Sequence, residues 1–304
     1  MRQILASFLA LFVLSGEIHA QSLRVDPVTE HTYAIIGPLS QRSGENLGNN
    51  ATFGLIVTDE GAILIDAGGT YKGAAMLDQA IQSVTDQPVV LVINSGGQDH
   101  RWLGNGYWQE HGAKIIASSA AVADQADRAS MQLTGLAAMV GADGLAGTEP
   151  VYADTTFDDE TMVTLGGVTL ELAHAAAHTP GETRIWMQAE SVMFTGDLVY
   201  VERILGVGPQ SSPLDWVASF EAMAMYDPAH IVPGHGAATD LAGATADTYD
   251  YLMNLRTQIA ALIEDGGDII AAPKVDQSAF AYLENFEGLA GRNAQETFSQ
   301  MEWE

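Results

Sequence analysis

The sequence contains no cysteine among its 304 residues. This absence excludes disulfide bonds, a thiol nucleophile, thiolate zinc sites and iron–sulfur clusters. Any metal ion bound by this chain must therefore be held by histidine, aspartate, glutamate or an amide oxygen.

Basic residues are also scarce. The chain has 12 lysines and arginines against 39 aspartates and glutamates, which gives a formal net charge of −27. Such a charge repels the phosphate backbone of nucleic acids and anionic membrane surfaces, so we expect neither as a partner. The acidic surface is interpreted as a solubility trait, and it says little about the chemistry of a site.

Long apolar runs are missing apart from one short stretch near the N-terminus. Arg2, the apolar run 4–14 and the small residue Ala20 before Gln21 have the organisation of an export signal. The run is too short for a bilayer core, which needs about 20 apolar residues. We therefore expect residues 1–20 to be a signal peptide, the protein to be periplasmic or secreted, and no membrane insertion.

The rest of the chain, residues 21–304, is predicted to be a single domain with its core at about 30–255, followed by a C-terminal helix and a polar tail. Short β-branched runs alternate with segments of helical periodicity. Strands are expected at 32–36, 52–58, 62–66, 88–93, 113–117, 162–175 (two strands), 184–188, 191–195 and 231–232. Helices are expected at 71–84, 102–111, 118–140, 214–226 and 247–263. This order predicts an α/β fold, a four-layer αβ/βα sandwich of two mixed β-sheets with outer helices.

Histidines follow several of the predicted strands. His100, His174, His178 and His235 come just after strands, and Asp197 follows another. Sites in α/β proteins are assembled where strands end. In the absence of cysteine, neutral imidazole and carboxylate are the natural zinc ligands, so these residues predict a metal site.

Four segments carry a more specific resemblance: Asn94–Asn105, Ala177–Gly181, Phe194–Asp197 and Val232–Gly236. Their order and spacing resemble those of the metallo-β-lactamase superfamily over most of the mature chain. The resemblance implies the four-layer sandwich, a zinc site and hydrolytic activity. Within the superfamily the chain looks most similar to exported zinc hydrolases associated with quinoprotein and sulfur-oxidation systems.

The chain departs from this family in the loop after the strand 88–93, where the family has His-x-His-x-Asp-His. Counted without gaps, Gly96 and Gln98 stand at the first two histidines, His100 at the aspartate and Arg101 at the last histidine. With a slip of one residue, Asp99 and His100 become the Asp-His pair. In either register the family's first metal position loses two imidazoles, and the sequence leaves both registers open.

Because an amide oxygen is a weak zinc donor and glycine offers none, we expect one zinc ion rather than two, with manganese or iron as alternatives. The expected ligands are drawn from His100, His178, Asp197, His235, Asp99 and Gln98. Such an ion lowers the pKa of bound water to about 7 and supplies hydroxide. Asp99 or Asp197 would then orient the nucleophile as a catalytic carboxylate.

Other polar residues are given secondary roles. Arg101, Tyr200 and Arg203 are candidates for contact with the substrate. Asp66, which ends a strand before Gly68 and Gly69, is expected to bind loop backbone amides. Asn94 and Asn105 are expected to satisfy backbone groups of the loop between them. His174 is expected to be a hydrogen-bonded residue at a strand end, and the tail 280–304 to pack back on the domain or on a partner.

The predicted function is an exported metal-dependent hydrolase that acts through metal-bound hydroxide on a small molecule, an ester, thioester, lactone, sulfate ester or amide. Gly96, Gln98 and Arg101 motivate an alternative, a metal-depleted and non-catalytic binding protein on the same fold. A true β-lactamase is a further alternative, which the altered first motif disfavours. The sequence predicts no oligomeric state.

Overall fold

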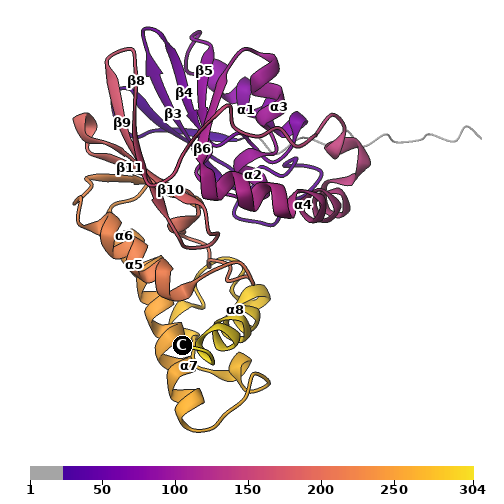
Figure 1. Ribbon diagram of the computed structural model, residues 1–304, viewed down its shortest axis with the longest axis vertical. Coiled ribbons are helices and arrows are strands. Elements are labelled where there is room, and N and C mark those ends of the chain that lie inside the picture. Colours follow the sequence, from indigo (N-terminus) through magenta and orange to yellow (C-terminus); the bar gives the residue numbers. More distant parts are fainter. Residues whose placement is uncertain (1–22) are drawn as a thin grey trace, which may run out of the picture.

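The structure is a computed structural model that describes residues 23–304, so the predicted signal peptide lies outside the described residues. Two mixed β-sheets face each other, and helices cover their outer faces (Figure 1). The predicted four-layer αβ/βα sandwich is therefore confirmed. Among the described residues, no helix combines the length and the apolar character needed to cross a bilayer.

Seven strands form the first sheet in the order of the chain. They are β1 (Arg24–Pro27), β2 (Thr32–Ile36), β3 (Thr52–Thr58), β4 (Gly61–Ile65), β5 (Val89–Ile93), β6 (Lys114–Ser118) and β7 (Thr155–Phe157). Strands β1 to β4 pair antiparallel, whereas β4 to β7 pair parallel. The carboxyl ends of β4 and β5 consequently lie at the same edge of this sheet.

Five strands form the second sheet in the order β12-β11-β10-β9-β8. They are β8 (Glu160–Leu165), β9 (Val168–Ala175), β10 (Glu182–Met187), β11 (Val192–Phe194) and β12 (His230–Val232). β11 and β12 are parallel, and the other neighbours are antiparallel. Because β10 runs against both of its neighbours, the carboxyl ends of β9, β11 and β12 share one edge.

The connections carry the helices. They are α1 (Tyr71–Gln82), α2 (Asp99–Trp102), α3 (Asn105–Glu110), α4 (Ser119–Leu145), α5 (Pro213–Ala224), α6 (Leu241–Ala244), α7 (Asp250–Glu264) and α8 (Phe286–Met301). Short helical turns add η1 (Gln188–Glu190), η2 (Gly196–Leu198), η3 (Thr245–Tyr249), η4 (Ala272–Lys274) and η5 (Ser278–Phe280). Side-chain oxygens of Thr70, Ser118 and Ser212 cap α1, α4 and α5 by accepting a backbone N–H three residues further on.

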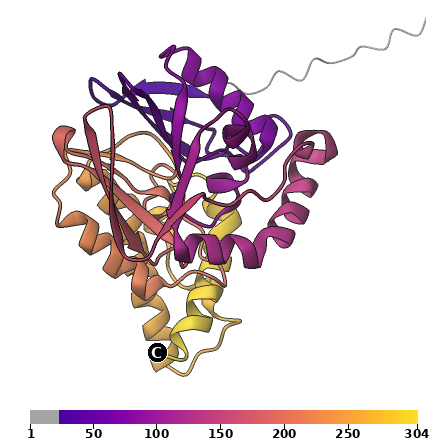
Figure 2. The ribbon, with the colours of Figure 1, turned by 45° about the horizontal axis from the view of Figure 1, so that its top comes forward.

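The alternation of side chains along the strands builds the layers. In β2, Ala34 and Ile36 face the second sheet, whereas Ile35 between them faces the helices. The space between the sheets is filled in this way by aliphatic residues of both, while α1 and α3 cover the first sheet and α5 and α7 pack beside the second. Figure 2 shows the two groups of helices on either side of the sheets.

The structure differs from the prediction in three places. The helix predicted at 102–111 is two helices, α2 and α3, separated at Gly104, where a Cβ atom would lie 2.1 Å from the carbonyl oxygen of Ala67. The edge strands β1 and β7 were not predicted. The polar tail contains the helix α8, which was not predicted. It packs on α7 and buries Ala294 and Phe298 in a shared core, so of the two expectations for the tail, packing back on the domain is confirmed.

Candidate metal centre

Five strand ends bring the polar residues together at one end of the sandwich. Asp66 follows β4, His100 and Arg101 follow β5, His178 follows β9, Asp197 follows β11, and His235 follows β12. All six are buried. The convergence that the sequence predicted for His100, Asp197 and His235 is present in the structure.

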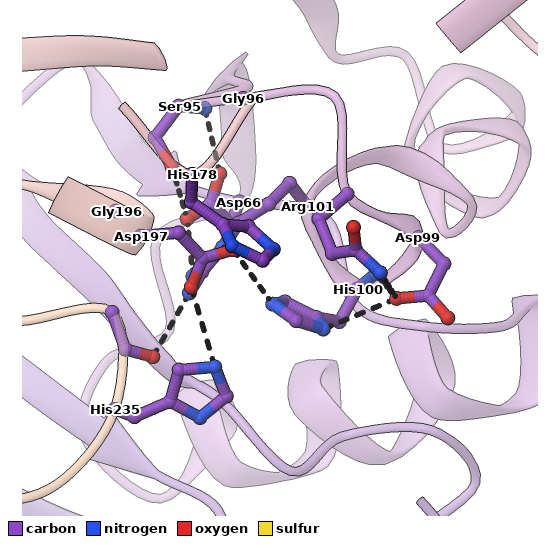
Figure 3. A network of polar contacts seen from close by, with 12 residues as sticks. Asp66, Ser95, Gly96, Asp99, His100, Arg101, His178, Gly196, Asp197 and His235 are labelled. Atoms are coloured by element: carbon purple, nitrogen blue, oxygen red, sulfur yellow. Dashed lines mark hydrogen bonds and ion pairs between the residues drawn. The ribbon is translucent and has the colours of Figure 1, made fainter. Parts of the chain in front are cut away.

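His100, Asp197 and His235 form the centre of this cluster. Each offers a ligand atom, and the three atoms lie within 4.8 Å of one another. The Nε2 atoms of His100 and His235 are each 3.2 Å from a different oxygen of the Asp197 carboxylate. Figure 3 shows the two imidazoles reaching this carboxylate. The donor set is two nitrogens and one oxygen, a combination typical of zinc.

The hydrogen bonds of His235 determine where its lone pair lies. Its Nδ1 is 2.8 Å from the carbonyl oxygen of Asn50, which only accepts, so Nδ1 carries a proton. Burial and the nearby guanidinium of Arg203 hold the pKa of His235 well below its usual value. The Nε2 lone pair therefore faces a carboxylate oxygen of Asp197, and two acceptors that face each other call for a cation between them.

His100 is held from its other side. Arg42 donates from Nη2 to Nδ1 of His100 at 2.7 Å, and the same guanidinium forms an ion pair with Asp99. Asp99 Oδ1 is also 3.2 Å from Nδ1 of His100. Burial would raise the pKa of Asp99, but Arg42 and His100 outweigh it and hold that pKa below its usual value. Asp99 thus lies beside the imidazole of His100 and outside the three-residue cluster.

Arg101 lies beneath the cluster and is fully buried. Its guanidinium donates to Asp197 at 2.7 and 3.3 Å, to Asp66 at 2.8 Å, and to the carbonyl oxygens of Thr52 and Gly234 at 3.1 and 2.9 Å. Burial would lower the pKa of Arg101, but the two carboxylates more than offset this and raise it. The side chain does not reach the cavity described below, so the predicted contact between Arg101 and a substrate has no route.

The two carboxylates that flank Arg101 behave differently. Burial raises the pKa of Asp66 despite the charge of Arg101. Burial opposes ionisation of Asp197 too, but Arg101 and His100 hold its pKa well below the usual value. Asp66 also accepts from the backbone N–H and the hydroxyl of Ser95, at 2.7 and 2.8 Å. The expected bond between Asp66 and a loop amide is therefore confirmed.

The loop is closed by its two asparagines. The Asn94 side chain donates to the carbonyl oxygen of Arg101 at 2.8 Å and to the Asn105 side chain at 3.0 Å. Asn105 returns a bond to Asn94 at 2.9 Å. The expectation is confirmed for Asn94, whereas Asn105 bonds the Asn94 side chain and the carbonyl oxygen of Val151, outside the loop.

His178 stands apart from the three-residue cluster. Its Nδ1 donates to the carbonyl oxygen of Gly206 at 2.8 Å, so its Nε2 has a lone pair when the ring is neutral. Burial lowers the pKa of His178 to about 4. The ring packs edge-on against Trp216, 5.7 Å between centroids. His174, the neighbouring histidine, instead donates to the carbonyl oxygen of Pro180 at 2.7 Å, the structural role expected for it.

The two glycines of the loop make room for carboxylates. A Cβ atom on Gly96 would lie 2.6 Å from Glu182 Oε2, and one on Gly97 would lie 1.9 Å from Asp124 Oδ2. Oε1 of Glu182 accepts from the backbone and side chain of Thr179, whereas its buried Oε2 has no hydrogen-bond partner among residues 23–304. Burial and the charge of Asp197 raise the pKa of Glu182 well above its usual value. Space at Gly96 is thus filled by a neighbouring side chain.

A cavity of about 380 Å³ opens above the cluster. His100, His178 and His235 all border it. Of the other residues singled out in the sequence, Gln98, Asp99, Tyr200 and Arg203 also border the cavity, with Tyr200 stacked on His235 at 4.6 Å between ring centroids. Gln98 donates to Asp99 at 3.3 Å and accepts from Arg128 at 3.4 Å. Its role as a metal ligand stays a prediction.

Sequence reasoning missed Arg42 and Glu182. Arg42 belongs to a loop 57 residues before its partner Asp99, in no recognisable motif. Glu182 follows the Thr-Pro-Gly turn, where it reads as an ordinary acidic residue in an acidic chain. The only signal in the sequence was the scarcity of basic residues. With 12 basic against 39 acidic residues, each arginine is expected to form an ion pair with some carboxylate, but the sequence does not indicate which one.

Comparison with known proteins places these residues in context. The sequence profile of a family described as the Metallo-beta-lactamase superfamily matches residues 48–235. The chain is 26% identical over 121 residues to the Beta-lactamase-like protein 2 homolog of Caenorhabditis elegans, which spans 40% of each protein. It is also 26% identical over 195 residues to the hydroxyacylglutathione hydrolase GloC of Haemophilus influenzae, covering 62% of this chain and 86% of that one.

Solved structures show the same architecture. The inverting sec-alkylsulfatase Pisa1 from Pseudomonas sp. matches with a TM-score of 0.70 and 17% identity, over 91% of this chain and 50% of that chain. A metallo-beta-lactamase from Pontibacter korlensis matches with a TM-score of 0.62 and 19% identity, over 77% of this chain and 100% of that chain. At these identities the similarity shows a shared fold.

Proposed function

The chain belongs to the metallo-beta-lactamase superfamily, and from this premise we propose that it is a metal-dependent hydrolase whose ion is held by His100, Asp197 and His235. The observation that carries the proposal is the convergence of three buried donor atoms within 4.8 Å. Within that set a nitrogen and an oxygen acceptor face each other at 3.2 Å, an arrangement that a cation would satisfy.

The donor set suits one ion. Three protein ligands with a fourth position open to the cavity is the arrangement of catalytic zinc sites. A second ion beside Asp197 would meet the guanidinium of Arg101, which already donates to both Asp197 oxygens and to one Asp66 oxygen. We therefore propose one zinc ion, with manganese or iron as alternatives of the same valence.

Binding at His100 requires a change of tautomer. Its Nδ1 now accepts from Arg42, so the neutral ring carries its proton on Nε2. With Nε2 as a ligand, the ring would carry its proton on Nδ1, which would give up the hydrogen bond from Arg42 and donate to Asp99 Oδ1, 3.2 Å away. We propose that Asp99 positions His100 in this way, in place of the direct orientation of water expected from the sequence.

The chemistry follows from these positions. A bound zinc ion would supply Lewis acidity and lower the pKa of water to about 7. Asp197 would be the carboxylate ligand of that ion, because each of its two oxygens lies 3.2 Å from the Nε2 of one of the two imidazoles. His178 presents an unprotonated Nε2 at the cavity wall because its Nδ1 proton is donated to Gly206, and it can accept a proton there. Tyr200 restrains the ring of His235 by stacking on it.

The proposed reaction is hydrolysis of a small-molecule ester, thioester, lactone, sulfate ester or amide. Two similar proteins are a hydroxyacylglutathione hydrolase and an alkylsulfatase, which supports testing a thioester and a sulfate ester first. Export to the periplasm or the medium remains a prediction of the N-terminal sequence.

The test is metal analysis joined to an activity panel. The purified protein is stripped, reconstituted with zinc, and assayed for bound metal and for turnover of thioester, sulfate ester and nitrocefin. We expect about one equivalent of zinc, lost together with turnover in His235→Ala and retained in His174→Ala, a histidine that bonds a backbone carbonyl outside the cluster. Wild-type protein with well under one equivalent of zinc, manganese or iron after reconstitution would contradict the proposal.

One observation favours a second candidate, a metal-free binding protein on the same fold. Arg101 already compensates the charge of Asp197. The Asp197 carboxylate therefore attracts a cation less strongly than a carboxylate without an ion pair would. Under this alternative the reconstituted protein is metal-free and inactive on the whole panel. Nitrocefin turnover that depends on zinc would instead identify a β-lactamase.

A further inference from the structure

The cavity above the cluster gathers positive charge in an acidic chain. Its border includes Arg42, Arg128, Arg203 and Arg292, four of only twelve basic residues against 39 acidic ones. In a chain with about three times as many acidic as basic residues, each arginine is expected to have a carboxylate nearby. The question is which of these four guanidinium groups have their charge balanced by the protein itself.

Two of the four are balanced. Arg42 forms an ion pair with Asp99, and Arg128 forms one with Asp124. Among residues 23–304, neither Arg203 nor Arg292 has a carboxylate oxygen within 4.0 Å of its nitrogens. Arg292 is exposed to solvent, whereas Arg203 is only 5% exposed. Burying an unpaired charge is strongly unfavourable unless something else compensates it.

The hydrogen bonds of Arg203 are incomplete as well. Its buried Nε has no acceptor within the described part of the chain, and Nη1 makes only a long contact of 3.5 Å with the carbonyl oxygen of Ser40. Nη1 also lies 3.4 Å from Nδ1 of His235, but that nitrogen donates its proton to Asn50 and cannot accept another. The guanidinium is therefore held beside the cluster with donors to spare.

The outer part of the cavity has a different character. Met131, Leu136 and Met139 of α4 border it, and Leu289 of α8 borders it as well. Met131 and Met139 stand eight residues apart, close to two helical turns, and are 63% and 40% exposed. Large apolar side chains left exposed at the mouth of a cavity are typical of a ligand site.

We propose that the cavity binds a small organic anion, whose carboxylate, sulfate or phosphate group pairs with Arg203 and whose apolar part packs against Met131 and Met139. An anion on Arg203 lies next to His235, so the rest of the molecule is placed over the cluster. If the protein is the proposed hydrolase, such anions are its substrate class, and to that extent the proposal rests on the proposed function. Binding of the anion itself requires neither metal nor turnover.

The test measures binding of simple carboxylates to the full chain after dialysis against EDTA. Calorimetry compares acetate, butyrate and hexanoate with hexanol and hexylamine. We expect hexanoate to bind and the neutral and cationic molecules of equal length to bind at least about tenfold more weakly. Each added methylene should tighten carboxylate binding by up to about fourfold. Equal affinity for hexanoate and hexanol in the unaltered protein would overturn the proposal.

Variants then locate the two ends of the ligand. Arg203→Met should weaken hexanoate binding at least about tenfold, Arg203→Lys should weaken it less, and Arg256→Met, which breaks a remote pair with Glu304, should leave it unchanged. The double variant Met131→Gln, Met139→Gln should remove the gain from butyrate to hexanoate. Arg203→Met that binds hexanoate as tightly as wild type would refute the assignment.

The outcome is separable from that of the proposed function. Hexanoate binding without metal or turnover would support the anion site and refute the hydrolase. Zinc-dependent turnover without preference for anionic ligands would support the hydrolase and refute the anion site.

Discussion

Replacement of Arg101 by methionine tests how the centre is held together. The substitution keeps a long side chain in a fully buried position but removes the guanidinium that donates to Asp66, Asp197 and two backbone carbonyls. Removing one partner of a buried ion pair costs about 3–5 kcal/mol because the other charge stays buried. Since whole domains are stable by only about 5–15 kcal/mol, Arg101→Met should lower the urea midpoint severely.

The loss should also depend on pH. Without Arg101, the folded-state pKa of Asp66, which burial already raises, should rise further, and that of Asp197 should rise from its low value. A carboxyl group whose pKa is higher in the folded than in the unfolded state destabilises the fold fully above the folded-state pKa. This penalty disappears as the pH falls from the folded-state pKa to the unfolded-state pKa. The difference in free energy of unfolding between wild type and variant should therefore be larger at pH 8 than at pH 5.

Urea titrations followed by circular dichroism, in EDTA at both pH values, measure these differences. Arg256→Met is the matched control, because its pair with Glu304 is partly exposed and such pairs contribute about 0–1 kcal/mol. A loss below about 1 kcal/mol for Arg101→Met, equal at the two pH values, would show that the buried network is not what organises the centre.

Further predictions concern the surroundings of the centre. Gly181→Ala should lower the urea midpoint because its Cβ would lie 2.1 Å from the backbone at the start of α4, whereas Gly288→Ala in α8, with open space around it, should raise stability by up to about 1 kcal/mol. Gln132→Leu should cost about 1–3 kcal/mol in the same assay, because the buried indole N–H of Trp102, which now donates to Gln132 at 2.9 Å, would lose its acceptor. The lowered pKa of Asp99 adds stability that is present above about pH 5 and is lost progressively as the pH falls below the unfolded-state pKa near 3.9. The fall in urea midpoint between pH 5 and pH 3 should therefore be smaller in Asp99→Asn than in wild type. An equal fall in the two proteins would exclude this contribution.

Much of the architecture was accessible from local patterns. The strands at 32–36 and 52–58 match the prediction to the residue, because β-branched runs between turn residues have few alternatives. Predictions were poorer where packing overrode local preference. The break between α2 and α3 depends on the contact of Gly104 with another loop, and α8 is specified by burial of a few apolar residues within a polar stretch.

The sequence by itself determined which histidines and aspartates stand at strand ends, and hence that His100, Asp197 and His235 would meet. It did not determine what each residue of the turn at 99–102 contacts. Successive residues of a helix point about 100° apart, so Asp99 meets Arg42, His100 meets Asp197, and Arg101 enters the space between two carboxylates. Only tertiary structure decides these partners, because they come from segments distant in the chain whose positions depend on the packing of both sheets.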